Sequence, residues 1–438
     1  MIIVYTEEIT IRVKYIFSLL FKEFMKQEVS FTQDENEFRN AEYPKINYSE
    51  KYIPQASLWI IPHGLLFHLG IKEVEIEYVE YQGIKCPFKV KYTKADLPFD
   101  PFAASFFLIT RYEEYLPYKK DAYGRFSAEE SIAYKKGFLQ FPVIDQWAIN
   151  ISNILKEKHP HISFTKPEYT FIPTIDIDVA YKYKLRGLIR TIGGSTRSLM
   201  KFDLNSLIQR FRVILGLEKD PYDTFSYQLS LHKAYKLKPI YFILFADYDV
   251  NDKNISVLNK NFQSLIKSLG DYAEIGIHPS YNSFSKPSKM KKEIDRLSKT
   301  INKEVIKSRQ HFLRINIPTT YDHLESLGIK EDYTMGYAKS IGFRASTARP
   351  YYFYNLEMEM PSDLRIFPFA VMDGTLKDYM KLTPQQAEDT VRALISRTKA
   401  VNGVFVSLWH NHSLSEQEGW IGWSRVYETL LKEAAKHK

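Results

Sequence analysis

The 438-residue sequence predicts an α/β protein with two parts, a smaller α/β domain over residues 1–165 and a larger (β/α) barrel over residues 166–438. At about 150 residues per domain, the length favours two to three domains. In the larger part, apolar runs rich in β-branched and aromatic residues alternate with helical patterns, which is typical of parallel βαβ units. About seven such units over about 270 residues suit a (β/α) barrel, and a doubly wound open sheet is the alternative.

The N-terminal part alternates short strand-like runs with helical stretches. Strands are expected over 2–5, 57–61 and 74–81. Apolar residues recur at helical spacing from Ile9 to Phe24 with basic residues between them, which predicts an amphipathic surface helix capped by Thr6. A second helix is expected within 97–115. The polar stretch 156–167 contains two prolines and marks the boundary between the parts.

The C-terminal part contains the apolar runs that predict the barrel strands. They cover 169–177, 239–245, 273–277, 305–312, 342–345, 366–369 and 403–409. Helical patterns lie between them. The clearest one spans 288–302 and places Met290, Ile294 and Leu297 on one face.

Composition restricts the class of protein. Hydrophobic residues make up 45% and charged residues 26% of the chain, which is ordinary globular usage and excludes disorder as the dominant state. The single cysteine, Cys86, excludes an internal disulfide and a cysteine-rich zinc module. Glu7 and Glu8 interrupt the apolar start, unlike a signal peptide, and the longest uncharged stretch, 55–71, is too short to span a bilayer. We therefore expect a soluble cytoplasmic protein without a transmembrane segment, and a net charge of +8 is weak evidence for a nucleic-acid partner.

Two carboxylates end the first strand of the larger part. Alternation along a strand sends Asp176 and Asp178 to the same face. Two carboxylates together are costly unless a cation or hydrogen bonds compensate their charge, and a metal ion is the simplest compensation. The alternative is that one of them caps the next helix while the other is solvated.

Histidines end two other strands. His278 follows the run 273–277, and His410 and His412 follow the run 403–409. A neutral imidazole at a strand end can bind a metal or transfer a proton. Each histidine alone is as readily a hydrogen-bonded core or loop residue, but three strand ends with this chemistry indicate one shared site.

Arginines and one further carboxylate lie near other strand ends. Arg309 could hold a nearby carboxylate ionised and oriented. Arg314 and Arg344 could do the same, or form surface salt bridges. Asp373 could orient a histidine, but an ordinary turn with Gly374 is the favoured interpretation.

A basic run follows Asp178. Between residues 182 and 212 the sequence has eight Lys or Arg residues and one acidic residue, Asp203. This run could steer an anionic substrate, for example a diphosphate-linked sugar, or contact an anionic membrane surface. The alternative is a solvated helical face.

The order of these strand ends resembles the polysaccharide deacetylase family of carbohydrate esterases, in a divergent bacterial, family 4-like branch with an extra N-terminal domain. Thr174-Ile175-Asp176-Ile177-Asp178 resembles a divergent form of its first motif. His278 matches the first histidine of the His-x-x-x-His motif, whose second position is Asn282 here. Arg309 resembles the arginine of the third motif, and Leu408-Trp409-His410 resembles the closing Leu-His motif.

The resemblance implies a distorted (β/α) barrel and a metal-dependent deacetylase. Asp176 would be the general base, His410 the general acid and Arg309 a further catalytic residue. A divalent metal, Zn²⁺ first among the candidates, would be bound by Asp178, His278 and Asn282. The substrate would be an N-acetylated or otherwise N-acylated amino sugar or glycan precursor, which could be diphosphate-linked.

Two other classes of protein are alternatives. The paired carboxylates of a glycoside hydrolase stand about 5 to 9.5 Å apart across the scissile bond, which Asp176 and Asp178 on one strand cannot do. The stronger alternative is a non-catalytic glycan- or partner-binding protein on a degenerate deacetylase barrel, because the second motif lacks its second histidine.

Overall fold

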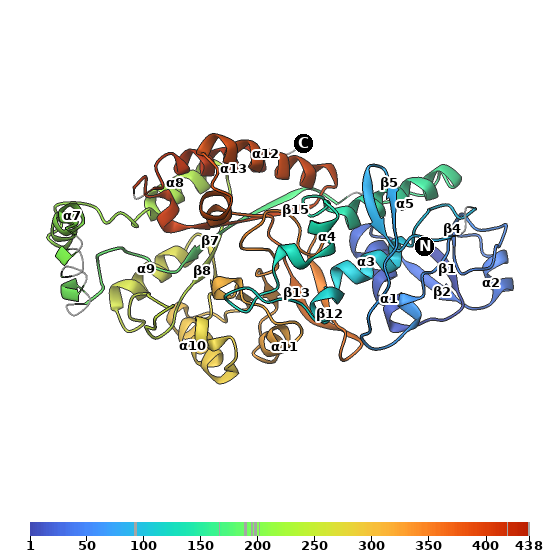
Figure 1. The fold of residues 1–438 in the computed structure, drawn as a ribbon, viewed down its shortest axis with the longest axis horizontal. Helices are drawn as coiled ribbons and strands as arrows, with labels where there is room; N and C mark the ends of the chain where they lie inside the picture. The colour runs from blue at the N-terminus through green and yellow to red at the C-terminus, as the bar shows by residue number, and fades with distance from the viewer. Residues whose placement is uncertain are drawn as a thin grey trace.

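The computed structural model describes residues 1–91, 94–165, 167–187, 191–193, 196, 199–200, 202–417 and 419–436. The molecule is elongated, with a small sheet near the N-terminus at one end, a large sheet in the middle and helix α7 (Leu204–Ile214) at the other end (Figure 1). Among the described residues, none of the helices is both long enough and apolar enough to cross a membrane.

The small sheet has four parallel strands in the order β2-β1-β3-β4. Its strands are β1 (Ile2–Thr6), β2 (Val29–Thr32), β3 (Lys45–Tyr48) and β4 (Leu58–Ile60), and a separate hairpin joins β5 (Tyr78–Tyr81) to β6 (Ile84–Pro87). The helices are α1 (Ile11–Ser18), α2 (Glu35–Asn40), α3 (Pro101–Ile109), the short α4 (Ile132–Lys135) and α5 (Val143–Lys158). The strand expected over 74–81 is thus limited to its last four residues.

Helix α1 differs from the predicted surface helix. Thr10, not Thr6, is its N-cap, because the Thr10 side chain accepts a hydrogen bond from the Val13 amide. Most of the helix is buried, including Arg12. The Arg12 guanidinium donates to the Leu65 carbonyl at 3.0 Å and to Glu359, far along the chain, at 2.9 Å. The sequence pattern predicts that the basic residues of this helix face solvent. Arg12 is buried instead because it forms an ion pair with Glu359.

The large sheet has nine strands in the order β12-β13-β11-β10-β9-β8-β7-β15-β14, and only β12 runs antiparallel to its neighbour. The strands are β7 (Thr170–Ile177), β8 (Ile240–Ile243), β9 (Glu274–Ile277), β10 (Lys307–Ser308), β11 (Glu331–Asp332), β12 (Tyr351–Asn355), β13 (Met360–Ile366), β14 (Val371–Met372) and β15 (Val404–His410). The predicted parallel strands with intervening helices are present. Within the described residues the ladder runs from β12 to β14 without closing.

The helices of this part pack on the sheet and include one near the predicted span 288–302. They are α8 (Phe225–Ala234), α9 (Lys260–Gly270), α10 (Pro287–Ile301), α11 (Thr319–Ser326), α12 (Pro384–Ala400) and α13 (Trp423–Ala435). Helix α10 buries Met290, Ile294 and Leu297, as its sequence pattern predicts.

Three predicted strands differ from the structure. The run 366–369 overlaps a strand only at Ile366, where β13 ends. The run 305–312 forms only the two-residue strand β10, and the chain then enters a turn. The run 342–345 forms no strand, because Gly342 adopts a positive φ of 121° and packs against the Leu139 carbonyl, where a Cβ atom would overlap it. The Phe343 amide donates to the same carbonyl at 2.8 Å. This stretch is therefore shaped by contact with the first part of the chain.

A buried ionic cluster joins the two parts. The Glu114 carboxylate accepts hydrogen bonds from Arg344 at 2.6 and 3.0 Å and from Arg111 at 2.8 Å. All three side chains are buried. Burial opposes the charge of Glu114, but the Arg344 and Arg111 guanidinium groups outweigh it and hold the pKa of Glu114 below its ordinary value. The expectation that Arg344 could form a surface salt bridge is wrong.

We predict that Glu114→Gln strongly destabilises the protein. The amide removes the negative charge and leaves the buried Arg344 guanidinium without its carboxylate partner, while Arg111 keeps only Glu113. Breaking a buried ion pair in this way typically costs about 3–5 kcal/mol. The measurement is the midpoint of urea unfolding, compared with the matched change Glu129→Gln at an exposed position. Equal midpoints for the two variants would contradict the structural role of the cluster.

Candidate metal centre and acid–base pairs

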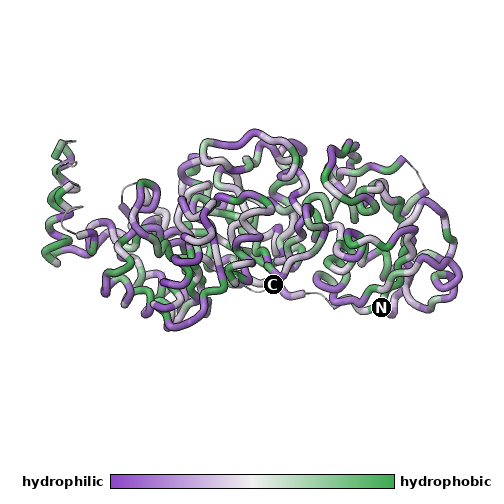
Figure 2. The backbone as a smooth tube through the Cα atoms, turned by 90° about the horizontal axis from the view of Figure 1, so that it is seen from below, coloured by the Kyte–Doolittle hydropathy of each residue, from purple (hydrophilic) through white to green (hydrophobic). Residues whose placement is uncertain are grey.

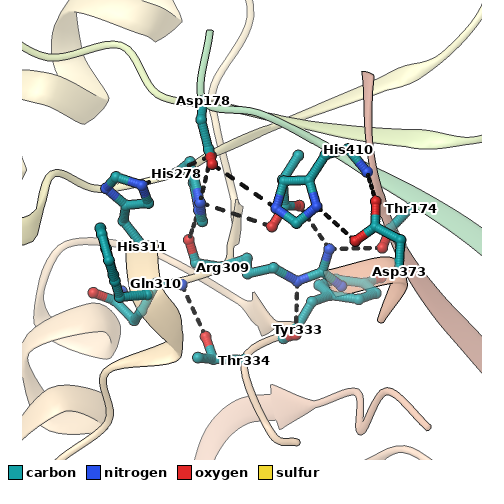
Figure 3. A network of polar contacts seen from close by, with 12 residues as sticks. Thr174, Asp178, His278, Arg309, Gln310, His311, Tyr333, Thr334, Asp373 and His410 are labelled. Carbon is teal, nitrogen blue, oxygen red and sulfur yellow. Dashed lines mark hydrogen bonds and ion pairs between the residues drawn. The ribbon is translucent and has the colours of Figure 1, made fainter. Parts of the chain in front are cut away.

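The side chains predicted to share a site lie at one edge of the large sheet. Strands β7, β9 and β15 are parallel to their neighbours, so their carboxyl ends meet at the same edge. Asp176, Asp178, His278 and His410 are brought together there (Figure 3). The register of β15 against β7 pairs His410 directly with Asp176.

Two of these side chains, Asp178 and His278, form together with His311 a group that could hold a metal ion, called the Asp178 group below. The ligand atoms of the three residues all lie within 4.8 Å of one another. The Asp178 Oδ1 atom lies 3.2 Å from His278 Nε2 and 3.8 Å from His311 Nε2. One carboxylate and two imidazoles are a common ligand set for zinc and similar divalent ions.

The second nitrogen of each imidazole is already engaged. His278 Nδ1 donates to the Arg309 carbonyl at 2.5 Å, and His311 Nδ1 donates to Asp252 at 2.9 Å. Because these bonds place a proton on Nδ1 of each ring, Nε2 is the nitrogen that faces Asp178, and it would bind a metal ion through its lone pair after giving up any proton of its own. Bonds of this kind orient metal-binding histidines.

The electrostatics of the group also suit a cation. The buried Asp178 Oδ1 atom accepts no hydrogen bond from the described residues. Burial opposes the charge of Asp178, but His311 and His278 hold its pKa well below the ordinary range. Burial lowers the pKa of His311, yet Asp178 and Asp252 together raise it to about 9. A site that stabilises positive charge in this way fits a divalent metal.

The predicted third ligand, Asn282, does not join the group. Its side chain is exposed, and its amide donates to Asp249 at 2.5 Å. His311 lies beside Asp178 and His278 instead. The sequence did contain a signal, since His311 directly follows Gln310 and Arg309. This signal was missed because a strand was predicted over 305–312. In the structure β10 ends at Ser308, and the chain then turns toward the site.

Arg309 holds Asp176. Its guanidinium donates to Asp176 Oδ1 at 2.8 Å and to Thr174 Oγ1 at 2.6 Å, while its Nε donates to the Tyr333 carbonyl at 2.9 Å. All of these groups are buried. The other oxygen of Asp176 lies 3.7 Å from His278 Nε2. Arg309 therefore holds the Oδ1 atom of Asp176 in place, and the Oδ2 atom of Asp176 lies toward the Asp178 group.

Asp373 holds His410. The Asp373 carboxylate accepts hydrogen bonds from the His410 amide and from His410 Nδ1, both at 2.8 Å, and another from the Ser413 hydroxyl. Burial lowers the pKa of His410, but the Asp373 charge outweighs it and raises the pKa to about 10. The expectation of an ordinary turn at Asp373 is wrong, because this carboxylate is fully buried against the histidine.

The remaining predicted candidates lie beside the site. The His412 ring packs against Tyr222 and Trp420, and burial followed by the His410 charge lowers its pKa to about 4. Arg314 stacks on Tyr281 and donates to the Tyr281 carbonyl at 3.0 Å. Neither side chain belongs to the Asp178 group.

A cavity of about 160 Å³ opens over the site. Besides the Asp178 group, Asp176 and His410, its wall includes Gln310, Met372, Tyr379 and Arg125. The buried Gln310 carboxamide nitrogen donates to none of the described residues, so it is available to a bound molecule.

Arg125 belongs to the first part of the chain, and no sequence pattern indicates that it lies beside this site. It donates to the Phe312 carbonyl at 2.7 Å and pairs with Asp121 at 2.8 Å. The neighbouring Tyr123 ring packs on the Phe312 ring at 5.1 Å. Phe312 and Leu313 both have a positive φ, which is strained for residues other than glycine. Residues 121–125 thus hold the strained turn that follows His311.

Comparison with known proteins gives a match for the first part of the chain. Residues 2–160 match the model of a family of unknown function, DUF7033. No curated protein matches the chain.

Several solved structures are similar to this chain over somewhat more than half of its length. One, from Mycobacterium smegmatis and named as a polysaccharide deacetylase, is 14% identical with a TM-score of 0.41, and the match covers 63% of this chain and 86% of that one. The polysaccharide deacetylase Bc1974 from Bacillus cereus is 12% identical with a TM-score of 0.31, over 61% and 87% of the two chains. The allantoinase Puue is 12% identical with a TM-score of 0.37, over 63% and 87%. The chemistry of the site therefore rests on its own side chains.

We predict that Asp178→Asn and His311→Ala each weaken zinc binding by at least about 100-fold, because each change removes a candidate ligand. Asn282→Ala is the matched control and should leave the zinc affinity unchanged. The measurement is competition with a chromophoric chelator. A large loss in Asn282→Ala, with His311→Ala unaffected, would restore the sequence-based assignment.

We also predict that Arg125→Met weakens zinc binding by about 10-fold, as loss of a supporting contact around a metal ligand typically does. The change removes the bond to the Phe312 carbonyl and frees the turn that carries His311. Arg39→Met, at a partly exposed arginine of the same part, is the control. Equal zinc affinities in the two variants would show that the turn holds its shape without Arg125.

Proposed function

We propose that the protein is a metal-dependent hydrolase that removes N-acetyl or other N-acyl groups from an amino sugar or glycan precursor. One observation carries the proposal: a carboxylate held by an arginine and an imidazole held by a carboxylate occupy paired positions of adjacent strands, beside the Asp178, His278 and His311 group. This arrangement offers a base and an acid beside one candidate metal position.

Asp178, His278 and His311 would hold the metal. When bound, a divalent ion such as Zn²⁺ supplies Lewis-acid activation of water and of the acyl carbonyl. The fixed tautomers of His278 and His311 and the free Asp178 Oδ1 atom support this assignment.

Asp176 would act as the general base. Arg309 occupies its Oδ1 atom and stabilises the ionised form, so Oδ2 can accept a proton from attacking water. Arg309 is itself fixed by the Tyr333 carbonyl and Thr174. It therefore acts by positioning Asp176.

His410 would act as the general acid. Its Nδ1 atom donates to Asp373, and its Nε2 atom lies 3.8 Å from Asp178 Oδ2, on the side of the candidate metal position. The Asp373 charge stabilises the imidazolium, which can donate the Nε2 proton to the leaving amine as the C–N bond breaks. A buried histidine without that carboxylate would favour the neutral form.

The cavity limits the acyl group and the substrate class. Its volume of about 160 Å³ is below the roughly 300–1,000 Å³ of typical ligand pockets, so it admits a short acyl group better than a long chain. Its wall combines polar Gln310 with apolar Met372 and Leu408. The sequence resemblance to carbohydrate deacetylases supports a sugar amine as the leaving group.

We predict that Asp176→Asn and His410→Ala each lower turnover by about 10²–10⁴-fold, which is the usual loss when a general base or acid is removed. Zinc content should remain that of the wild type, because neither side chain belongs to the Asp178 group. The control His161→Gln changes an exposed histidine. The measurement is acetate release from N-acetylglucosamine oligomers and nucleotide-linked N-acetylglucosamine.

Two outcomes would reject the proposal. One is a zinc-loaded wild type that releases no acetate from any of these compounds while still binding them, which would indicate a glycan-binding protein. The other is full activity in Asp176→Asn or His410→Ala.

A further inference from the structure

A segment directly after β7 exposes an unusual number of large apolar side chains. Among the described residues of this segment, Ile214 is 45% exposed, Phe202 is 90% exposed, and the others lie between these values. The set comprises Ile192, Leu199, Met200, Phe202, Leu204, Ile208, Phe211, Ile214, Leu215 and Leu217. Single exposed apolar residues are normal, but a contiguous group marks a surface that contacts something else.

Helix α7 shows how this surface is organised. Leu204, Ile208 and Phe211 are spaced by four and three residues, so they form one stripe on the helix, which Leu215 extends at its C-cap. The other side of the helix faces the protein, where Val213 is buried and the Gln209 amide donates to Gln417 at 2.9 Å. A surface helix normally turns its apolar stripe inward, and α7 does the reverse.

This helix projects from the body of the molecule. In Figures 1 and 2 it lies at the end opposite to the small sheet, and apolar segments run along it in Figure 2. Its base is fastened by Asp220, whose carboxylate accepts hydrogen bonds from the amides of Lys182 and Tyr183 at 2.8 Å and of Lys184 at 3.0 Å. The projecting segment follows Asp178 in the sequence, so the chain connects it directly to a residue of the site.

The charge of the segment complements an anionic surface. Between residues 182 and 212 the sequence has eight basic residues and one acidic residue. They are Lys182, Lys184, Arg186, Arg190, Arg197, Lys201, Arg210 and Arg212, of which Arg190, Arg197 and Lys201 lie outside the described residues. Like charges would oppose the pairing of this segment with its counterpart on a second copy of the chain, whereas anionic headgroups would attract it.

We propose that α7 and the exposed apolar residues around it dock the protein on an anionic lipid surface. The apolar stripe of Leu204, Ile208 and Phe211 enters the boundary between headgroups and acyl chains, and the basic residues contact the headgroups. The helix lies in the plane of the surface and does not cross it. This proposal is independent of the hydrolase activity, because it concerns a surface outside the catalytic cavity.

The test is flotation with phosphatidylcholine vesicles and with vesicles of equal parts phosphatidylcholine and phosphatidylglycerol. The wild type should float with the anionic vesicles, and high salt should reduce this binding, because salt screens the headgroup attraction. The double variant Ile208→Glu, Phe211→Glu should lose at least about tenfold in partitioning, since it places two charges at the apolar boundary. The control Leu69→Glu, Met358→Glu adds the same charge at two exposed apolar residues elsewhere.

Other results would overturn the proposal. Equal partitioning of the two double variants would show that the stripe does not contact lipid, and equal binding to both vesicle types would exclude anionic recognition. Absence of binding by the wild type would reject lipid docking outright. If sedimentation then showed a dimer that only Ile208→Glu, Phe211→Glu dissociates, the surface would instead bind a second copy.

Discussion

The parallel pairing of β15 with β7 is the constraint on which the site depends. Seven successive register pairs join the last strand of the chain to the first strand of the large sheet. The final pair sets His410 opposite Asp176, two side chains that are far apart in the sequence. A shift of one residue would turn His410 to the other face of the sheet and separate it from the carboxylates. The backbone hydrogen-bond ladder between β15 and β7 thus holds Asp176 and His410 side by side.

The side chains of Asp176 and His410 each have their own partner of opposite charge. Arg309 neutralises Asp176, and Asp373 balances the imidazolium of His410. Among the residues that the structure describes, Asp178 forms ion pairs with histidines and with no arginine or lysine. A carboxylate buried without a permanent counter-ion is costly, and a bound cation relieves that cost. Asp176 at the end of β7 therefore has an arginine as its partner, whereas Asp178, two residues later, faces histidines.

The sequence predicted the parts of the site that follow from strand periodicity. Asp176, Asp178, His278 and His410 end runs of apolar residues, and parallel strands bring such ends together. His311 was not predicted as a candidate metal ligand, and an orienting role for Asp373 was ranked below an ordinary turn. Each residue belongs to an irregular segment whose path depends on distant contacts. Arg12 shows the same limit in the fold, since a solvent-facing pattern in the sequence conceals its partner Glu359, which lies hundreds of residues away.

The contact of Arg125 with the Phe312 carbonyl has a consequence for how the chain can change over evolution. A segment matched by a family of unknown function supplies a support for the turn that follows His311 in the other part. The two parts cannot then be exchanged independently for those of other proteins, because the larger part joined to a foreign first part would lose this support. Substitutions in 121–125 and in 311–314 should accordingly occur together among related chains, and the gene should resist separation into two expressed halves.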